Sequence, residues 1–267
     1  MPILPITDPD DPRIADYRDI RERDLVGRRD LFVAEGEVVL ATLVASRRHR
    51  PLSLLLDERR VASLAPLLAQ LEPEVPIYVA ARGVLDAIAG FPLHRGILAL
   101  GRRAPWPSAA ALIADLRERA LVVVALGIAN HDNIGGIFRN AAAFGASAVL
   151  LDDRCCDPFY RKALRVSVGH VLTVPSTRLA PGEDPVGLLR GAGFEVLALS
   201  PSAGEQLVDV RSAARTAIVL GTEGPGLPDS VLERARPIGI AMAAGVDSLN
   251  VATTAAVVLH HLATAGA

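Results

Sequence analysis

The chain has 267 residues, a formal net charge of −2, 51% hydrophobic residues and 22% charged residues. This composition excludes a disordered or fibrous chain, and the length suffices for one large domain or two small ones with a buried core. The longest apolar run, residues 120–129, is too short to cross a bilayer, which needs about 20 residues. No basic segment precedes an apolar one at the start, so we expect no secretory signal, no membrane partner and a cytoplasmic location.

Arginine accounts for almost all of the basic residues, because Lys162 is the single lysine among 28. The nearly balanced net charge neither indicates nor excludes nucleic acid, so a local cluster of arginines would have to supply binding. Cys155 and Cys156 are adjacent, and neighbouring cysteines rarely form a disulfide with each other. Neither they nor the six histidines show the spacing of a metal site, so we expect reduced thiols and no metal.

A turn-rich stretch with arginines and prolines, residues 101–108, separates two patterns. We therefore expect a small α/β domain over residues 1–103, a linker over 104–116 and a second domain over 117–267. In the first domain, the apolar pattern predicts helices at 14–45, 61–71 and 84–89 and strands at 52–56, 77–79 and 97–100.

The second domain alternates regularly between strands and helices. Apolar runs predict strands at 121–126, 148–152, 171–174, 195–199, 217–220 and 238–242, with helices at 134–144, 160–168, 185–192, 230–235 and 249–262. This alternation predicts an α/β fold with a parallel sheet covered by helices on both faces. Ligands bind outside the carboxyl ends of such strands, so the residues that follow each strand are the candidates for a site.

The first of these strands is followed by a polar, glycine-containing segment, residues 130–140. We expect Asn133 to cap the next helix, and Gly135 and Gly136 to allow close approach of a ligand. Arg139 lies off the apolar stripe of this helix and is either a functional group or an ordinary surface arginine. The fingerprints of dinucleotide-binding and phosphate-binding loops are both absent from the sequence.

Two later segments carry further polar residues. Three glycines and a proline within residues 221–226 predict a rigid turn, in which Glu223 is either functional or a solvated loop charge. Before the last helix, Ser248 or Asn250 could serve as the helix cap. That helix is apolar on nearly every face, so it must be covered, in part by a second subunit.

Together and in this order, three motifs resemble those of the SpoU (TrmH) family of RNA 2′-O-ribose methyltransferases, in the SPOUT superfamily. They read Asn-Ile-Gly-x-Ile-x-Arg at 133–139, Leu-Gly-Thr-Glu-Gly-x-Gly-Leu at 220–227, and Ile-x-Met at 240–242 with Ser-Leu-Asn-Val at 248–251. The resemblance covers about residues 117–267. The first 100 residues resemble, more loosely, the small RNA-binding α/β domain of ribosomal-protein type that many members carry.

This resemblance implies a parallel sheet with a C-terminal trefoil knot, a homodimer, and S-adenosylmethionine bound in the knotted turns. The residues it implies for cofactor binding are Gly221, Thr222, Ile240, Ala241, Met242 and Leu249. The implied catalytic residues are Asn133, Arg139, Glu223, Ser248 and Asn250. The third motif departs from the family pattern at Ala241, where the family usually has proline, and at Ala244, where it often has glycine.

The implied substrate is structured RNA, either ribosomal or transfer RNA, bound through the first domain. That domain contains 15 arginines and 15 acidic residues up to residue 103, so only clustering could create a binding surface. The arginines that we expect to contact RNA are Arg47, Arg48, Arg50, Arg102 and Arg103, and Arg59–Arg60 form another candidate pair.

Two alternatives to ribose methylation stay open at this point. One is an RNA-binding protein that kept the knotted fold without activity, and the other is a SPOUT enzyme that methylates a base. The filled polar positions disfavour the first, while the spacing from Asn133 to Arg139 and the Ser248–Asn250 triplet favour ribose over base. A dehydrogenase would fit the alternating pattern, but the chain lacks the required fingerprint.

Overall fold

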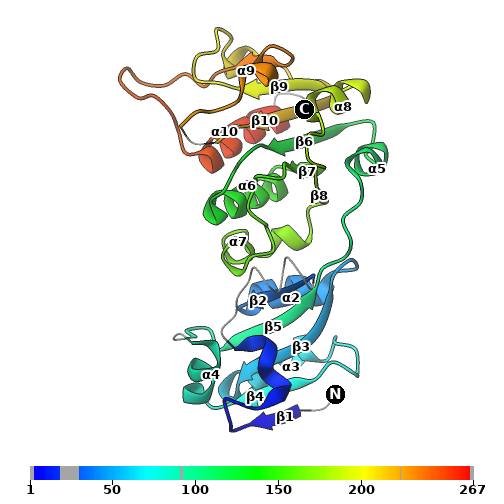
Figure 1. Ribbon diagram of the computed structural model, residues 1–267, viewed down its shortest axis with the longest axis vertical. Helices are drawn as coiled ribbons and strands as arrows, with labels where there is room; N and C mark the ends of the chain where they lie inside the picture. Colours follow the sequence, from blue (N-terminus) through cyan, green and yellow to red (C-terminus); the bar gives the residue numbers. More distant parts are fainter. Residues whose placement is uncertain (1–2, 19–29, 91–92, 223, 265–267) are drawn as a thin grey trace. The chain divides into compact units, whose positions relative to one another are not determined.

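The computed structural model describes residues 3–18, 30–90, 93–222 and 224–264. The chain folds into two compact units, each with its own sheet and helices (Figure 1). The first unit comprises Met1–Pro105 together with Phe159–Thr173, and the second comprises Trp106–Pro158 and Val174–Ala267. The helix that we expected at 160–168 within the second domain is therefore part of the first unit.

The first unit is built on a five-stranded sheet in the order β1-β4-β3-β5-β2. Its strands are β1 (Ile3–Ile6), β2 (Leu31–Glu35), β3 (Arg50–Asp57), β4 (Ile77–Ala80) and β5 (Ile97–Arg102). Its helices are η1 (Pro12–Tyr17), α2 (Glu37–Ala45), η2 (Glu58–Arg60), α3 (Val61–Leu68), α4 (Arg82–Ala89), α7 (Arg161–Val166) and η3 (His170–Leu172). Strand β5 runs antiparallel to both neighbours, so β2, β3 and β4 end at the same edge.

The long helix expected at residues 14–45 is wrong for the segment Leu31–Glu35. All five of these residues are buried in β2, which pairs with β5 far along the chain. Helix α2 begins only at Glu37, after Gly36, whose φ of 91° is a left-handed conformation that favours glycine. Pairing between strands far apart in the sequence thus overrides the local apolar pattern. Another part of the expected helix, residues 19–29, lies outside the described residues.

The second unit contains a six-stranded sheet in the order β11-β9-β10-β6-β7-β8, and every pairing in it is parallel. Its strands are β6 (Ala120–Ala125), β7 (Ala148–Leu151), β8 (Ser176–Arg178), β9 (Glu195–Leu199), β10 (Arg215–Leu220) and β11 (Arg236–Ile238). Its helices are α5 (Ala109–Ala114), α6 (His131–Ala143), α8 (Pro185–Gly191), α9 (Asp229–Leu232) and α10 (Val251–Thr264), with a short 3-10 turn η4 (Leu207–Asp209). The expected α/β fold with a parallel sheet is confirmed.

At three places in or near the second unit, the observed elements differ from those that the sequence pattern predicts. The strand expected at 171–174 is displaced, because His170–Leu172 form a 3-10 turn and the strand follows as β8. The segment expected as a linker, 104–116, contains α5, whose apolar side chains belong to the core of the second unit. The last strand ends at Ile238, so the third motif, residues 240–242, lies in a loop.

Helices α6 and α10 pack closely beside the sheet of the second unit. A Cβ on Gly136 would lie 2.7 Å from the Cβ of Ala252, and Asn140 Nδ2 donates to the Ala252 carbonyl at 2.7 Å. Most apolar side chains of α10 are buried by the chain itself, while Val257 is 39% exposed. Among the described residues, no helix combines the length and the hydropathy that a membrane span requires.

Candidate active site

A cavity of about 350 Å³ opens at the carboxyl ends of three strands of the second unit. The last residues of β9, β10 and β11 all line it, as expected for a parallel α/β sheet. Five of the six residues expected to bind cofactor also line it: Gly221, Thr222, Ile240, Met242 and Leu249. The sixth, Ala241, is exposed and does not line the cavity.

In the turn after β10, the backbone of Gly221 has no free space beside it, whereas Gly224 and Gly226 are open. A Cβ on Gly221 would lie 2.5 Å from the carbonyl carbon of Gly226, so no larger residue fits without a backbone shift. Gly226 N donates to the Thr222 carbonyl at 3.2 Å and closes the turn. Gly224 and Gly226 have φ values of 89° and 72°, which favour glycine.

Thr222 supplies the observation that points most directly to a ligand. Its Oγ1 is buried, and in the described part of the chain it has no hydrogen-bond partner. An unpaired buried hydroxyl costs about 1–3 kcal/mol, which a ligand in the cavity would recover by hydrogen bonding. The apolar side chains of Ile240 and Leu249 add walls suited to an uncharged ring, so the cavity fits an adenosyl cofactor.

The first and third motifs meet through a hydrogen bond between two asparagines. Asn250 Nδ2 donates to Asn133 Oδ1 at 2.9 Å, across 117 positions of sequence. Asn250 Oδ1 accepts from the backbone of Ala252 at 2.9 Å, so Asn250, rather than Ser248, caps α10. The expected capping role of Asn133 is wrong, because Asn130 caps α6 by accepting from Asp132 N at 2.8 Å.

Arg139 is exposed on α6, three residues after Gly136 and therefore next to the helix face that contacts α10. Within the described residues, no ion pair or hydrogen bond engages its side chain. Its guanidinium is thus available for an anion. Ser248 lines the cavity, whereas Glu223, also expected in the catalytic set, lies outside the described residues.

Residues after β7 also lie near this site, and the sequence analysis missed them. Asp152 Oδ1 accepts from Gly127 N at 2.9 Å, and Arg154 Nε lies 3.1 Å from Asp152 Oδ2. A Cβ on Gly127 would be 2.5 Å from the Thr222 methyl group, so this turn lies against the cavity wall. Their place in the sequence could have indicated them, because they lie just after the ends of β6 and β7.

Four of the five arginines expected to bind RNA are exposed in the first unit. They are Arg47, Arg48, Arg50 and Arg102, and Arg50 lies opposite Arg102 in the pairing of β3 with β5. Arg103 differs, because its side chain is only 15% exposed and pairs with Asp30 at 2.6 Å. Its guanidinium also lies over the Phe159 ring, 5.4 Å from the centroid, so its contacts are structural.

Three buried or half-buried groups, His49, Cys155 and Cys156, are uncharged at neutral pH. Burial lowers the pKa of His49 to about 4, and its Nδ1 accepts from Ala104 N at 3.2 Å. Burial also raises the pKa of the Cys155 and Cys156 thiols to about 12, which keeps both protonated. Across the described residues, no group of three metal-ligating side chains comes together.

Comparison with known proteins identifies the family of this chain. The model of the SpoU rRNA Methylase family matches residues 120–260. An uncharacterized tRNA/rRNA methyltransferase of Mycobacterium bovis is 39% identical over 275 residues, covering all of this chain and 93% of the relative. The 23S rRNA (guanosine-2'-O-)-methyltransferase RlmB of Salmonella typhi is 28% identical over 212 residues, covering 78% of this chain and 87% of the relative.

A solved structure shares the fold over almost the whole chain. The AdoMet-bound rRNA methyltransferase from Sinorhizobium meliloti superposes with a TM-score of 0.81 at 22% identity, covering 97% of both chains. The family match extends over more than half of the chain and includes all three motifs. The chain therefore belongs to the SpoU family of RNA methyltransferases.

Proposed function

We propose that this protein methylates a ribose 2′-hydroxyl in structured ribosomal or transfer RNA. The observation that carries the proposal is the Asn133–Asn250 hydrogen bond, which joins the first and third motifs beside the cavity. The similarity to a 23S rRNA (guanosine-2'-O-)-methyltransferase supports ribose as the methylated group.

The methyl donor is S-adenosylmethionine, which supplies a methyl carbon already activated by its sulfonium sulfur. Thr222 Oγ1 and the glycine backbone of residues 221–226 would hold the polar edges of this cofactor. The side chains of Ile240, Met242 and Leu249 would contact its apolar parts. Ala241 in place of proline leaves its backbone N–H free to donate.

The chemical step requires alignment more than acid–base strength. The 2′-oxygen forms a bond to the methyl carbon while the carbon–sulfur bond breaks, and sulfur keeps the electron pair. The hydroxyl proton passes to the neighbouring RNA phosphate, to Ser248 or to water. The protein contributes by placing the hydroxyl in line with the methyl group, an effect of orientation.

Arg139 would position the RNA at this step. A guanidinium stays protonated in proteins, so a role as general base is excluded. With its exposed side chain available, Arg139 would bind the phosphate beside the target ribose in a bidentate contact and stabilise developing charge on the 2′-oxygen. Asn133, held by Asn250, and Glu223 would orient the ribose or Arg139.

The first unit would bind the RNA substrate. Arg47, Arg48, Arg50 and Arg102 are exposed and would contact backbone phosphates, which give affinity and salt dependence rather than sequence choice. Double-stranded RNA is recognised mostly by its shape, which fits a surface of this kind.

We further propose that the C-terminal segment forms a trefoil knot and that the protein is a homodimer. Support for the knot comes from the chain beyond β11, which runs beside an earlier loop. Leu207 N donates to the Gly239 carbonyl at 2.7 Å, and Gly239 N donates to the Glu205 carbonyl at 2.9 Å. Support for the dimer comes from Val257, an apolar side chain exposed on α10.

Transfer of labelled methyl from S-adenosylmethionine to unmodified total RNA tests the proposal. The RNA is separated into ribosomal and transfer pools and digested to nucleosides. We expect label in a 2′-O-methylated nucleoside from one pool. Label on a base would instead indicate a base methyltransferase, and good RNA binding without cofactor binding would indicate a silent binding protein.

A further inference from the structure

The first unit has a cavity of its own, at the corresponding edge of its sheet. This cavity, of about 700 Å³, lies where β2, β3 and β4 end and β5 begins. Its charged lining consists of Arg59, Arg60, Arg82, Arg95, Asp57 and Glu37. The edge of a sheet at which parallel strands end is where α/β proteins bind ligands. Four guanidinium groups at this edge point to an anion.

A buried carboxylate organises two of these arginines. Asp57, the last residue of β3, has a side chain that is only 3% exposed. Arg59 donates to both of its oxygens, from Nε at 3.0 Å and from Nη2 at 2.7 Å. These hydrogen bonds hold the pKa of Asp57 below its usual value, so the carboxylate stays charged and fixes Arg59.

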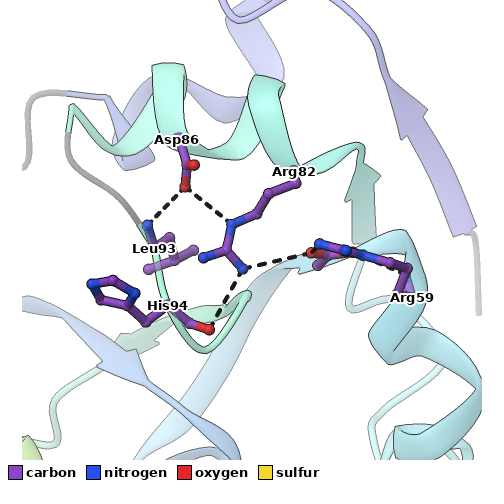
Figure 2. A network of polar contacts seen from close by, with 6 residues as sticks. Arg59, Arg82, Asp86, Leu93 and His94 are labelled. Atoms are coloured by element: carbon purple, nitrogen blue, oxygen red, sulfur yellow. Dashed lines mark hydrogen bonds and ion pairs between the residues drawn. The ribbon is translucent and has the colours of Figure 1, made fainter.

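Arg82 is fixed in the same network, from the first position of α4 (Figure 2). Its guanidinium lies 3.8 Å from Asp57 Oδ2 and 3.4 Å from Asp86 Oδ1, and it donates to the His94 carbonyl at 3.5 Å. Asp86 in turn accepts from Leu93 N at 2.7 Å, which ties the network to the backbone before β5. Arg59 and Arg82 are therefore held in place at the cavity.

Arg60 and Arg95 complete the lining and retain unused donors. Arg60 Nη2 pairs with Glu37 Oε2 at 2.7 Å, while its Nε is buried and, among the described residues, has no hydrogen-bond partner. Arg95 is exposed and lies against Gly36, where a Cβ would be 2.8 Å from its Cδ and Nη1. No ion pair of Arg95 occurs in the described part of the chain.

The side chains that line this cavity carry a net positive charge. Four arginines line it against two carboxylates, those of Asp57 and Glu37, while Asp86 and Glu58 lie next to Arg82 and Arg59. Each guanidinium carries five N–H donors, and only a minority are used within the part of the chain that the structure describes. The geometry matches phosphate oxygens, which accept bidentate hydrogen bonds from arginine.

We propose that this arginine edge, formed by Arg59, Arg60, Arg82 and Arg95, binds backbone phosphates of the substrate RNA. The inference rests on the proposed function for the identity of the ligand and adds a phosphate-binding site distinct from Arg47, Arg48, Arg50 and Arg102. Several guanidinium groups along one open edge suit a polyanion with regularly repeated charges.

The test compares the double variant Arg60→Gln/Arg95→Gln with the wild type. These two arginines are chosen because neither pairs with buried Asp57, so their removal leaves no buried carboxylate uncompensated. Binding is measured with labelled unmodified transcripts, one transfer RNA and one ribosomal RNA fragment, over a series of salt concentrations. We expect affinity to fall about three- to tenfold. The slope of log binding constant against log salt concentration should fall in magnitude by about 1 to 2.

A matched control removes two other arginines of the same unit. Arg13 and Arg18 pair with Asp11 and Asp10, outside the cavity, so Arg13→Gln/Arg18→Gln should keep the wild-type slope. The variant Arg60→Lys/Arg95→Lys keeps both charges and should restore most of the slope. Thermal unfolding and S-adenosylmethionine binding verify that each variant is folded.

Each outcome has a defined meaning. A wild-type slope in folded Arg60→Gln/Arg95→Gln overturns the arginine edge as a phosphate site, and so does an equal loss in the control. A wild-type protein that binds neither transcript also overturns it. Failure of the methylation reaction alone refutes the proposed activity without changing the outcome of the salt series, so the two proposals fail separately.

Discussion

Both units of this protein place a cavity where the strands of their sheets end, yet the two cavities have opposite character. The cavity of the second unit is lined by glycine backbone, apolar side chains, several hydroxyl groups and one carboxylate, and the Thr222 hydroxyl is unpaired within the described residues. The cavity of the first unit is lined by four arginines, two of which are held by a buried carboxylate. The topology of the sheet fixes where a site forms, and the residues that follow each strand decide which ligand it suits.

The difference follows from how each ligand is recognised. An adenosyl cofactor offers ring edges and an apolar face, so close backbone and apolar walls suit it. A nucleic acid offers repeated negative charges, so guanidinium groups that are fixed in position suit it. We therefore expect substitutions in the two units to separate catalysis and cofactor binding from RNA binding.

The largest effect should come from Arg139→Ala in the second unit. We expect turnover to fall by roughly 100- to 1,000-fold, because the group that stabilises charge on the 2′-oxygen is lost. Affinity for S-adenosylmethionine should stay within a few-fold of wild type, since Arg139 does not line the cavity. Single-turnover methylation and calorimetric cofactor titration measure the two effects. The control, Arg190→Ala, removes an exposed arginine on α8, and normal turnover by Arg139→Ala would refute the assignment.

The next effect concerns the segment Phe159–Thr173. Phe159 is 2% exposed, and its ring centroid lies 5.3 Å from that of Phe32 and 5.2 Å from that of His49. We expect Phe159→Ala to destabilise the first unit by about 3–5 kcal/mol, because it leaves a core cavity. Urea unfolding should show this loss while cofactor binding persists. Val208→Ala, at a 77% exposed position, is the control. Equal stability of the two variants would contradict the assignment of this segment to the core of the first unit.

A smaller effect should follow from Gly221→Ala. The added Cβ would meet the Gly226 backbone at 2.5 Å, so the turn that lines the cavity must shift. We expect S-adenosylmethionine affinity to fall about tenfold or more, with RNA binding by the first unit unaffected. In Gly191→Ala, by contrast, the new Cβ meets nothing within 4 Å, and this variant should bind cofactor normally. Unchanged affinity in Gly221→Ala would mean that the turn does not hold the cofactor.

The smallest effect is a pH dependence centred on His49 in the first unit. Its pKa is lowered to about 4 in the folded state, so the unfolded chain binds more protons between that value and the ordinary pKa of about 6.5. Stability is therefore retained above about pH 6.5 and lost as the pH falls towards 4, by at most about 3 kcal/mol. In His49→Asn, the amide oxygen can accept from Ala104 N as Nδ1 does, and this loss should disappear. Chemical unfolding across pH 4–7 measures the difference, and parallel curves for the two proteins would contradict the assignment.

The sequence predicted the parts of the site that depend on local pattern. The alternation of the second domain placed most of its strands within a few residues, because buried parallel strands are continuous apolar runs. The cavity also contains most of the residues that the motif resemblance implied for cofactor binding. Asp152 was missed because the strand expected at 148–152 included it, whereas β7 ends at Leu151. Ser200, which follows β9 and lines the cavity, belongs to no motif and was also missed.

The sequence by itself determined the α/β class, the glycine turn after β10 and the arginine-rich composition, because these depend on residue type and short-range periodicity. Only the tertiary structure decided that Leu31–Glu35 form a strand, that Phe159–Thr173 belong to the first unit, and that Asn133 bonds Asn250. It also decided that Arg103 is engaged with Asp30, while Arg59 and Arg82 share Asp57. Each of these contacts joins side chains or strands whose geometry depends on the folded chain, and no local pattern records such pairings.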